Sequence, residues 1–435
     1  MSSEGAARTH DPYAALRHAN FRRFFLGGTV ANMGQAMQNI AVGWDLYERT
    51  GFALALGGVG LVQVIPIVLL ALPAGHLADR LDRRRLLLAS QGVQILMSLG
   101  LAALAATHGP VPLIYLCLFI SAVARAFNAP ANNSFWPSLL PIEHYANAIT
   151  WRSSAFELAS VVGPAIGGML IGFRNSAVPA YLGCAALVLV FWINLCRIRA
   201  PSASRPHEPM NFDAVSAGLR FVWNHPVLLP AIALDMFAVL LGGATALLPI
   251  YAKDILHMGP SGLGWLRAAP AAGAVTMALV SAHRPVRHKA GATMLWAVAG
   301  FGVATIVFGG SRSFWLSMAA LYLTGVFDNM SVVIRHSLLQ LRTPDRMRGR
   351  VTSVNTVFIS CSNELGAFES GAVAALFTPV VSVVAGGIGT ILVVVAAAFK
   401  WPALRRLDAL LESSRAPAKT EIQEEGSRPS VRTNA

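Results

Sequence analysis

Charged residues are scarce in this sequence. Asp, Glu, Lys and Arg make up 13% of the 435 residues, whereas a soluble domain is typically about one-quarter charged. Hydrophobic residues account for 55%, and the mean hydropathy is +0.56. A soluble chain of this length would also divide into roughly two or three separate cores. The composition excludes an ordinary soluble protein and predicts a polytopic membrane protein.

Motifs for catalysis, metal binding and nucleotide binding are missing as well. The four cysteines, Cys117, Cys184, Cys196 and Cys361, show no CxxC spacing, so we interpret them as packing residues. The eleven histidines form no HExxH pair, and GxSxG, Walker A and dinucleotide-type GxGxxG patterns do not occur. We therefore expect no enzyme activity, no metal and no cofactor. A primary pump is also disfavoured, unless a separate subunit supplies the ATPase.

Twelve apolar runs are long enough to cross a bilayer, which takes about 20 helical residues. They lie at 23–46, 54–76, 86–106, 112–133, 150–172, 177–197, 227–250, 262–282, 291–309, 314–334, 351–376 and 379–399. The expected fold is an all-α polytopic membrane protein with twelve transmembrane helices. Because the start of the chain is polar and no small-residue cleavage site follows the first run, we expect no cleaved signal peptide.

Lys and Arg gather on one side of these spans. If the N-terminus is cytoplasmic, the opposite side holds only Arg49, Arg174, Lys253 and Arg312 of the 34 basic residues, and three more fall within or at the ends of spans. Basic residues are enriched in cytoplasmic loops. The pattern predicts that both termini are cytoplasmic. It also explains the net charge of +13 without a nucleic-acid partner.

The longest polar interruption inside the chain separates six predicted spans from six. The expected segments are a cytoplasmic N-terminus at 1–22, a six-helix bundle at 23–198, a cytoplasmic linker at 199–226, a second six-helix bundle at 227–400 and a disordered cytoplasmic tail at 401–435. A shift of 203 residues aligns one proline pair and two glycine pairs between the bundles, Pro141 with Pro344, Gly163 with Gly366 and Gly168 with Gly371. Parallel repeats of this kind bind substrate at their interface and rock about it.

The segment after the second span reads Gly75-His-Leu-Ala-Asp79-Arg80-Leu-Asp82-Arg83-Arg84-Arg85. It resembles the signature loop of the major facilitator superfamily, G-x-L-A-D-R-x-G-R-R, with Asp82 where the family prefers glycine. The resemblance extends over residues 20–400. It implies a gating latch between the halves made by Gly75, Asp79, Arg80, Arg83 and Arg84. From the residues alone, the same segment could be a positive-inside anchor.

Further segments resemble the bacterial transmembrane secretion effector branch, which contains the enterobactin exporter. These are Arg335 to Ser353 and the run Ser362-Asn363-Glu364-Leu-Gly366-Ala-Phe-Glu369-Ser-Gly371. Gly163, Pro164, Gly167 and Gly168 are similar to the helix-5 motif of the superfamily's antiporters, although Ala159 stands where glycine is expected. That motif implies export and a seal against proton leak, and close helix packing is the simpler reading. Arg125 resembles an arginine that the family places in its fourth helix.

Seven charged residues fall inside or at the edges of predicted spans, where a charge is costly and usually faces a cavity or a partner. They are Arg125, Glu157, Asp235, Arg267, Asp328, Glu364 and Glu369. We expect Glu364 and Asp328 to exchange protons, followed by Glu369 and Asp235, with structural ion pairs as the alternative. Glu157 is either a cavity residue or a charge at the N-terminus of its helix, and Asp235 could pair with backbone early in its span.

A polar stripe on the first span, Asn32, Gln35 and Asn39, predicts a cavity-facing surface, or hydrogen bonds between helices. Arg125, Phe127, Glu157 and Asn363 are the other predicted cavity residues. The family resemblance implies that helices 1, 4, 5, 7, 8, 10 and 11 form the cavity and that the halves move by alternating access.

The resulting hypothesis is a secondary transporter in the bacterial inner membrane. It would export a small amphipathic molecule, a siderophore or a lipophilic drug, in exchange for protons, and would act as a monomer with the lipid bilayer as its surroundings. One alternative is proton-coupled uptake of a nutrient or lysophospholipid. A non-transporting membrane receptor or scaffold is the other, and it predicts no requirement for intramembrane carboxylates.

Overall fold

The computed structural model describes residues 11–198, 212–284 and 288–407 of the chain. The first half (11–198) contains α1 (Ala14–Arg17), α2 (Ala19–Thr50), α3 (Ala53–Arg80), α4 (Arg83–Thr107), α5 (Val111–Phe135), η1 (Trp136–Leu139), η2 (Ile142–His144), α6 (Tyr145–Arg174) and α7 (Val178–Arg197). The second half (212–407) contains α8 (Phe212–Asn224), α9 (Leu228–Leu241), η3 (Ala244–Leu247), α10 (Leu248–Ile250), η4 (Tyr251–Ile255), α11 (Gly259–His283), α12 (Ala290–Gly310), α13 (Phe314–Arg342), α14 (Asp345–Leu376), α15 (Pro379–Lys400) and α16 (Pro402–Arg405). Every regular element in these ranges is helical, which confirms the predicted all-α class.

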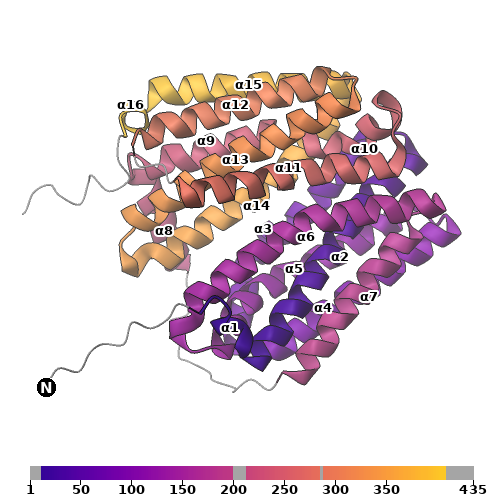
Figure 1. Ribbon diagram of the computed structural model, residues 1–435, viewed down its shortest axis with the longest axis horizontal. Helices are drawn as coiled ribbons and strands as arrows, with labels where there is room; N and C mark the ends of the chain where they lie inside the picture. The colour runs from indigo at the N-terminus through magenta and orange to yellow at the C-terminus, as the bar shows by residue number, and fades with distance from the viewer. Residues whose placement is uncertain (1–10, 199–211, 285–287, 408–435) are drawn as a thin grey trace, which may run out of the picture.

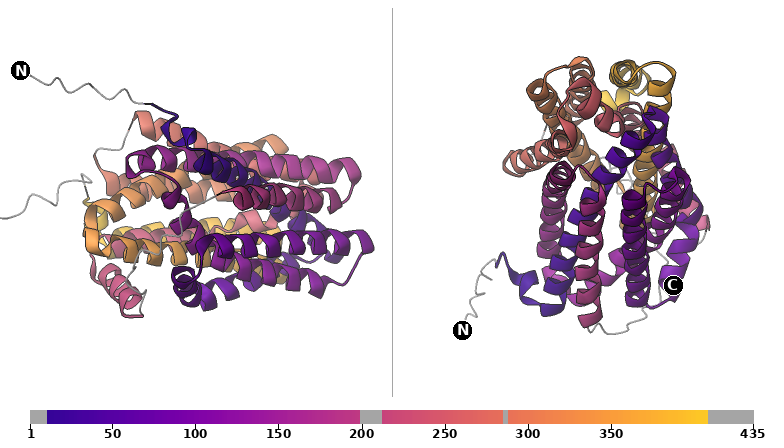
Figure 2. Two further views of the ribbon diagram at one scale, coloured as in Figure 1. Left: turned by 90° about the horizontal axis from the view of Figure 1, so that it is seen from below. Right: turned by 90° about the vertical axis from the view of Figure 1, so that its right-hand side faces the viewer.

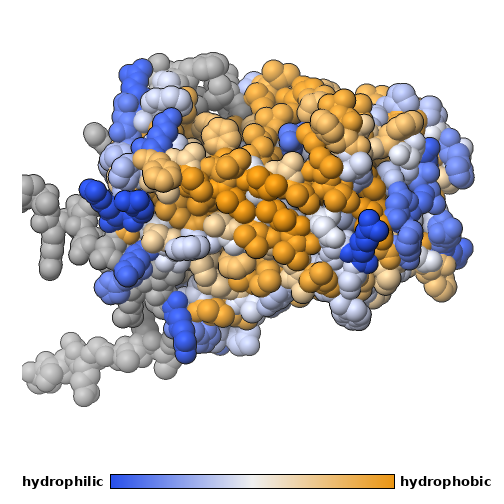
Figure 3. Space-filling model, turned by 90° about the horizontal axis from the view of Figure 1, so that it is seen from above, coloured by the Kyte–Doolittle hydropathy of each residue, from blue (hydrophilic) through white to orange (hydrophobic). Residues whose placement is uncertain are grey.

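Ten helical segments of the described chain are long and apolar enough to cross a membrane. Two further long helices, α2 and α14, have 32 residues each but carry more polar side chains. Helices that border a polar cavity keep such side chains, which would be costly against lipid. The long helices run side by side along the molecule (Figure 2). Apolar side chains cover the middle of the face in Figure 3, and hydrophilic ones gather towards its two ends. The twelve-helix membrane fold is thus confirmed for the described residues.

The predicted span 227–250 is interrupted in the structure. After α9 ends at Leu241, the backbone passes through Gly242 and Gly243 into η3, α10 and the π-helical η4. A Cβ on Gly243 would lie 2.7 Å from the carbonyl oxygen of Gly366 in α14, so glycine permits this approach. Interrupted helices in transporters occur where the backbone lines a binding site.

The two halves touch mainly through two helix pairs, α3 with α14 and α6 with α11, and α2 makes smaller contacts with α10 and α11. A Cβ on Gly371 would lie 2.6 Å from the Cα of Gly57, and one on Gly264 would lie 3.0 Å from the Cα of Gly168. Such close backbone approach is typical of small residues at membrane helix crossings. These crossings lie towards the right-hand end of Figure 1, whereas the helix ends at the left spread apart.

The internal repeat predicted from the sequence has a structural counterpart at its glycine pairs. Gly163 packs against α2, the first long helix of the first half, and Gly366 packs against α9, which begins the first predicted span of the second half. Gly168 packs against α11 and Gly371 against α3, so each lies at a crossing between the halves. The shared glycines therefore serve the same two helix contacts in both repeats.

The predicted gating loop is mostly helical. Because α3 runs to Arg80 and α4 begins at Arg83, only a short turn separates them. Asp82 has φ −59°, and its Oδ1 accepts hydrogen bonds from the backbone N–H groups of Arg84 (2.8 Å) and Arg85 (3.1 Å). The turn needs no glycine, since Asp82 is the N-cap of α4.

The predicted linker and the predicted disordered tail each contain a helix. The linker at 199–226 includes α8, which packs against α9 and α14 and buries Val222. In the tail predicted at 401–435, α16 packs against α12 and buries Leu404. Each helix packs through a few apolar side chains. These are too few to give an apolar run that a hydropathy pattern would detect. The remaining parts of these segments, 199–211 and 408–435, and residues 1–10 of the predicted N-terminal segment lie outside the described residues.

Candidate functional site

A cavity of about 230 Å³ lies between the two halves, and we call it the central cavity. Its polar and charged lining side chains come from α2, α3, α5, α11 and α14 and are Asn39, Gln63, Arg125, Arg267, Asn363 and Glu364. Thr245 and Ala246 of η3 line it as well. The interrupted seventh span therefore faces this cavity.

Glu364 is the only acidic residue among the described residues that line the central cavity. It interacts electrostatically with Arg125 of the first half and with Arg267 of the second half. Arg125 also donates a hydrogen bond to Oε1 of Gln63. Gly60 of α3 packs against the backbone carbonyl of Glu364, which sets the position of this carboxylate at the boundary between the halves. The carboxylate thus faces one cation on each half.

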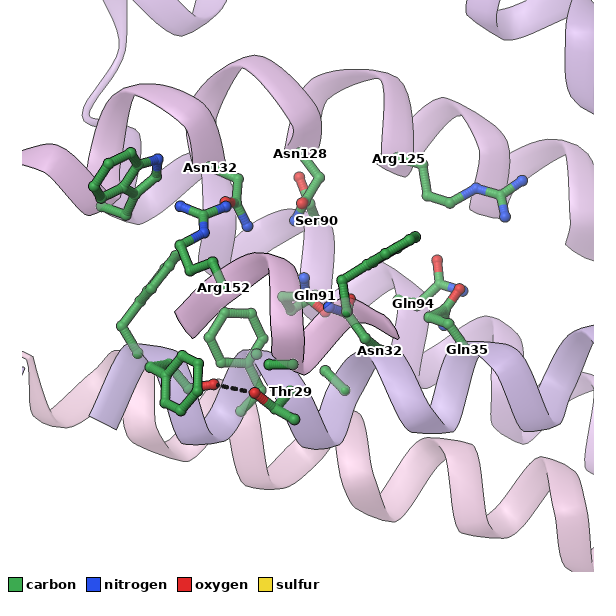
Figure 4. A pocket seen from close by; sticks show the side chains of 18 of the residues that line it. Thr29, Asn32, Gln35, Ser90, Gln91, Gln94, Arg125, Asn128, Asn132 and Arg152 are labelled. Atoms are coloured by element: carbon green, nitrogen blue, oxygen red, sulfur yellow. Dashed lines mark hydrogen bonds between the residues drawn. The ribbon is translucent and has the colours of Figure 1, made fainter. Parts of the chain in front are cut away.

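A larger cavity of about 570 Å³ lies within the first half, and we call it the amide pocket. Amide and hydroxyl side chains from α2, α4, α5 and α6 line it, namely Thr29, Asn32, Gln35, Ser90, Gln91, Gln94, Asn128, Asn132 and Ser153. Figure 4 shows Arg152 beside Asn132 at one end of the pocket and Arg125 at the other. Arg125 lines both cavities and so connects them.

The amide pocket also has an aromatic wall. It is formed by Phe24, Phe25, Trp136, Phe156 and Phe191. A polar contact between α4 and α2 also belongs to the lining, since Gln94 Nε2 donates to Gln35 Oε1 over 3.1 Å. A molecule with an apolar body and polar substituents matches this combination of surfaces.

The structure brings most of the predicted cavity residues together. Asn32 and Gln35 line the amide pocket, Asn39 and Asn363 line the central cavity, and Arg125 lines both. Phe127 and Glu157 line neither of these two cavities, and their role as cavity residues remains a prediction. The helices that line these two cavities differ from the expected set: helices 2, 3 and 6 of the predicted twelve contribute lining residues, and helix 10, which is α13, contributes to neither cavity.

Glu157 does not lie at the start of its helix, as one reading of the sequence had it. Because α6 begins at Tyr145, Glu157 is in the fourth turn. There it interacts electrostatically with Asp328 of α13, across the boundary between the halves. Asp328 forms no ion pair with Arg125 in the described chain, although the repeat makes the two positions equivalent. The charge that acts on Arg125 is that of Glu364.

Asp235 pairs with a side chain rather than with backbone. Its Oδ1 and Nη1 of Arg335 form an ion pair between α9 and α13. Both residues are buried, with 6% of Asp235 and 2% of Arg335 exposed. The sequence pattern places Arg335 in a loop after the span 314–334, but α13 continues to Arg342. The pairing favours a structural role for Asp235.

Among the four predicted proton-coupling residues, Glu364 alone lines one of the two cavities. Asp235 and Asp328 border a separate gap of about 10 Å³ in the second half, which is about the space that one water needs. Glu369 lies 3.5 Å from the hydroxyl of Ser370 and lines neither cavity. The structure therefore sets Glu364 apart from the other three.

The predicted gating arginines contact elements of their own half. Arg83 donates to the carbonyl oxygen of Ser134 at the end of α5 (3.1 Å), and Arg84 donates to that of Cys196 at the end of α7 (2.6 Å). Both contacts tie the start of α4 to its neighbours and do not cross between the halves. The other predicted members of the latch are Gly75, Asp79 and Arg80, which belong to α3. The structure does not describe the surroundings of their side chains. The latch between the halves remains a prediction.

The helix-5 motif lies on the two packed faces of α6. A Cβ on Gly163 would lie 2.7 Å from the carbonyl oxygen of Met33, and one on Gly167 would lie 3.0 Å from the Cα of Met37, both in α2. Gly168 approaches α11, and the carbonyl of Pro164 lies against Gly264 of the same helix. Close packing accounts for all four motif residues, Gly163, Pro164, Gly167 and Gly168.

The sequence reasoning missed the larger part of the amide pocket. Arg152 was counted only among the three basic residues that fall within or at the ends of spans, and Gln91, Gln94, Asn128 and Asn132 were not selected. A usable signal existed, because Gln91 and Gln94 are three residues apart and Asn128 and Asn132 are four apart, which places each pair on one helix face.

Comparisons with known proteins agree with this architecture. The model of the transmembrane secretion effector family matches residues 10–428. The chain is 28% identical over 356 residues to the multidrug efflux pump Tap of Mycobacterium tuberculosis, covering 79% of this chain and 84% of the relative. It is 27% identical over 385 residues to the enterobactin exporter EntS of Escherichia coli, covering 86% of this chain and 90% of the relative.

Solved structures of other transporters show the same fold. A bacterial homologue of the human lysosomal transporter Spinster, in an inward-facing and occupied conformation, matches with a TM-score of 0.69 at 16% identity, covering 91% of this chain and 98% of that one. A POT family transporter in complex with 5-aminolevulinic acid matches with a TM-score of 0.72 at 11% identity, covering 88% and 96%. The family and the relatives named above are transporters and not enzymes. The chain belongs to the transmembrane secretion effector family of the major facilitator superfamily.

Proposed function

We propose that this transporter exports a small amphipathic molecule from the bacterial cytoplasm in exchange for protons, and that Glu364 carries the proton. The observation behind the proposal is the position of Glu364 in the cavity between the halves, where it faces Arg125 on one half and Arg267 on the other. A group at this boundary changes its surroundings whenever the halves move relative to each other. A proton on Glu364 can therefore be linked to the conformation of the whole protein.

The orientation follows from the basic residues. Arg83, Arg84 and Arg85 lie at the α3–α4 turn, and we place this end in the cytoplasm by the positive-inside tendency. The amide pocket lies near the same end, because it is lined by Ser90 in the first part of α4 and Asn132 in the last part of α5. In this orientation the amide pocket lies towards the cytoplasmic end, and in our proposal cargo enters it from that side.

Arg125 couples the two cavities in this scheme. While Glu364 is ionised, it attracts Arg125 across the boundary between the halves. A cargo that offers an acceptor group to Arg125 from the amide pocket competes with this attraction and favours separation of the halves. In the outward-facing state Glu364 has lost Arg125 and keeps only Arg267 of its own half, and it takes up a proton from outside. After the cargo has left, the protonated carrier returns and releases the proton to the cytoplasm, where Arg125 again favours the carboxylate.

The test is transport by the purified protein in proteoliposomes, with the membrane potential clamped. The probes are naphthalene-2-sulfonate, ethidium and enterobactin. For proton antiport we expect uptake of at least one probe when the interior is more acidic than the exterior, and no accumulation without a pH gradient. Accumulation driven by an acidic exterior would instead indicate proton symport. The absence of protein-dependent flux with every probe would contradict the proposal in favour of a receptor or scaffold.

A further inference from the structure

The amide pocket contains a cation without a carboxylate partner. Arg152 of α6 donates a hydrogen bond from Nη2 to Oδ1 of Asn132 over 2.9 Å. Its Nη1 is buried and has no hydrogen-bond partner. No ion pair joins Arg152 to any acidic residue in the described part of the chain. A buried donor atom without an acceptor is costly unless a ligand supplies one.

The charge balance of the pocket is positive. Arg125 and Arg152 line it, and no Asp or Glu occurs among its described lining residues. Arg125 is offset by Glu364 in the neighbouring central cavity, whereas Arg152 has no such counterpart. An anion that enters the pocket is therefore attracted, and a cation is repelled, with little screening in a partly enclosed space.

Aromatic rings and amides surround the same guanidinium. Its Cζ lies 4.9 Å from the ring centroid of Trp136 and 5.9 Å from that of Phe24, within the range of cation–π contact. These rings hold the guanidinium in place but leave Nη1 free. Asn132 lies beside it, Asn128 lies one turn earlier in α5 (Figure 4), and both amides provide further hydrogen-bonding groups to the pocket. A guanidinium held in this way matches a carboxylate, sulfonate or phenolate group.

We propose that the amide pocket is an anion-selective cargo site. It binds amphipathic molecules whose acidic group docks on Arg152 while their aromatic or apolar body lies against Phe24, Trp136 and Phe156. The inference rests on the proposed export function, since it assigns the cargo class of that transporter. Cationic drugs of the same size and shape are poor ligands of this pocket.

The experiment is equilibrium binding to the purified full chain in nanodiscs of neutral phosphatidylcholine, so that no anionic lipid competes. Three probes share one naphthalene body: naphthalene-2-sulfonate, 2-naphthylmethanol and naphthylmethyl-trimethylammonium. We expect the sulfonate to bind at least about tenfold more tightly than the ammonium compound, because a charge-assisted hydrogen bond is worth about that factor or more. In Arg152→Gln this preference disappears, and in Arg152→Lys part of it returns.

Arg174→Gln is the matched control, since Arg174 is an exposed arginine at the far end of the same helix. It should keep the preference for the sulfonate. Equal or tighter binding of the ammonium compound by the wild type would overturn the proposal. An unchanged preference for the sulfonate in Arg152→Gln would also overturn it. That result is expected if the role of Arg152 is to pair with the second half in another conformation. Because binding needs no proton gradient, these results are independent of whether Glu364 couples transport to protons.

Discussion

Proteoliposomes that contain the Glu364→Gln variant are expected to accumulate no cargo when a pH gradient is imposed. Glutamine keeps the size and hydrogen bonding of the side chain but cannot bind or release a proton in this pH range. The fall should reach the level of liposomes without protein. Exchange of labelled for unlabelled probe across the same membrane should continue, because it needs no net proton movement. Measuring gradient-driven uptake and exchange side by side separates loss of coupling from loss of folding.

Glu369→Gln is the matched control for this prediction. Glu369 lies five residues further along α14, and its side chain lines neither of the two cavities. The variant should retain gradient-driven uptake. If Glu364→Gln transports as the wild type does and Glu369→Gln does not, the assignment of proton exchange to Glu364 is wrong, and Glu369 is the proton carrier. Asp328→Asn tests the remaining candidate, which faces Glu157 across the halves.

The second large effect concerns stability. Replacing Asp235 by leucine removes the partner of Arg335 and leaves a buried guanidinium uncompensated. Removing one member of a buried ion pair typically costs about 3–5 kcal/mol. We therefore expect the free energy of unfolding of Asp235→Leu to fall by about this amount, as measured by chemical denaturation of the purified protein. Transport should fall mainly through the smaller amount of folded protein.

A double variant provides the control. Asp235→Leu combined with Arg335→Met replaces the pair with apolar side chains of similar length, a change that is often neutral or stabilising in other proteins. Most of the lost stability should return, and gradient-driven transport should return with it. A double variant that folds as well as the wild type but remains inactive would show that Asp235 takes part in proton coupling.

Hydropathy predicted the fold because a bilayer imposes a simple rule on length and polarity. The rule failed at two places for physical reasons. The first turns of α6, from Tyr145, lie before the predicted span, so Glu157 appeared to be terminal although it lies in mid-helix. The break at Gly242 and Gly243 occurs inside a run that stays apolar throughout, and hydropathy carries no information on backbone geometry.

The candidate site was predictable only in part. Glu364 and Arg125 stand out in the sequence because charges in apolar runs are costly, and both line the central cavity. The ion pair of Asp235 with Arg335 joins residues that are 100 positions apart, so no local spacing indicates it. Arg152 was missed because an arginine near the end of a span cannot be distinguished, by sequence, from the basic residues that set the orientation of the chain in the membrane. Only the three-dimensional arrangement reveals that its Nη1 is buried without a hydrogen-bond partner and that no carboxylate pairs with it in the described residues.

The central claim, that cargo leaves as protons enter, is tested most directly by following protons. Wild-type proteoliposomes are loaded with naphthalene-2-sulfonate, or another probe that the protein transports, and with a pH-sensitive dye, and are then diluted into probe-free buffer without a pH gradient. As the probe leaves, the interior should become more acidic, and Glu364→Gln should abolish this change. An interior that becomes alkaline, or that keeps its pH while the probe leaves through the wild-type protein, would contradict proton antiport.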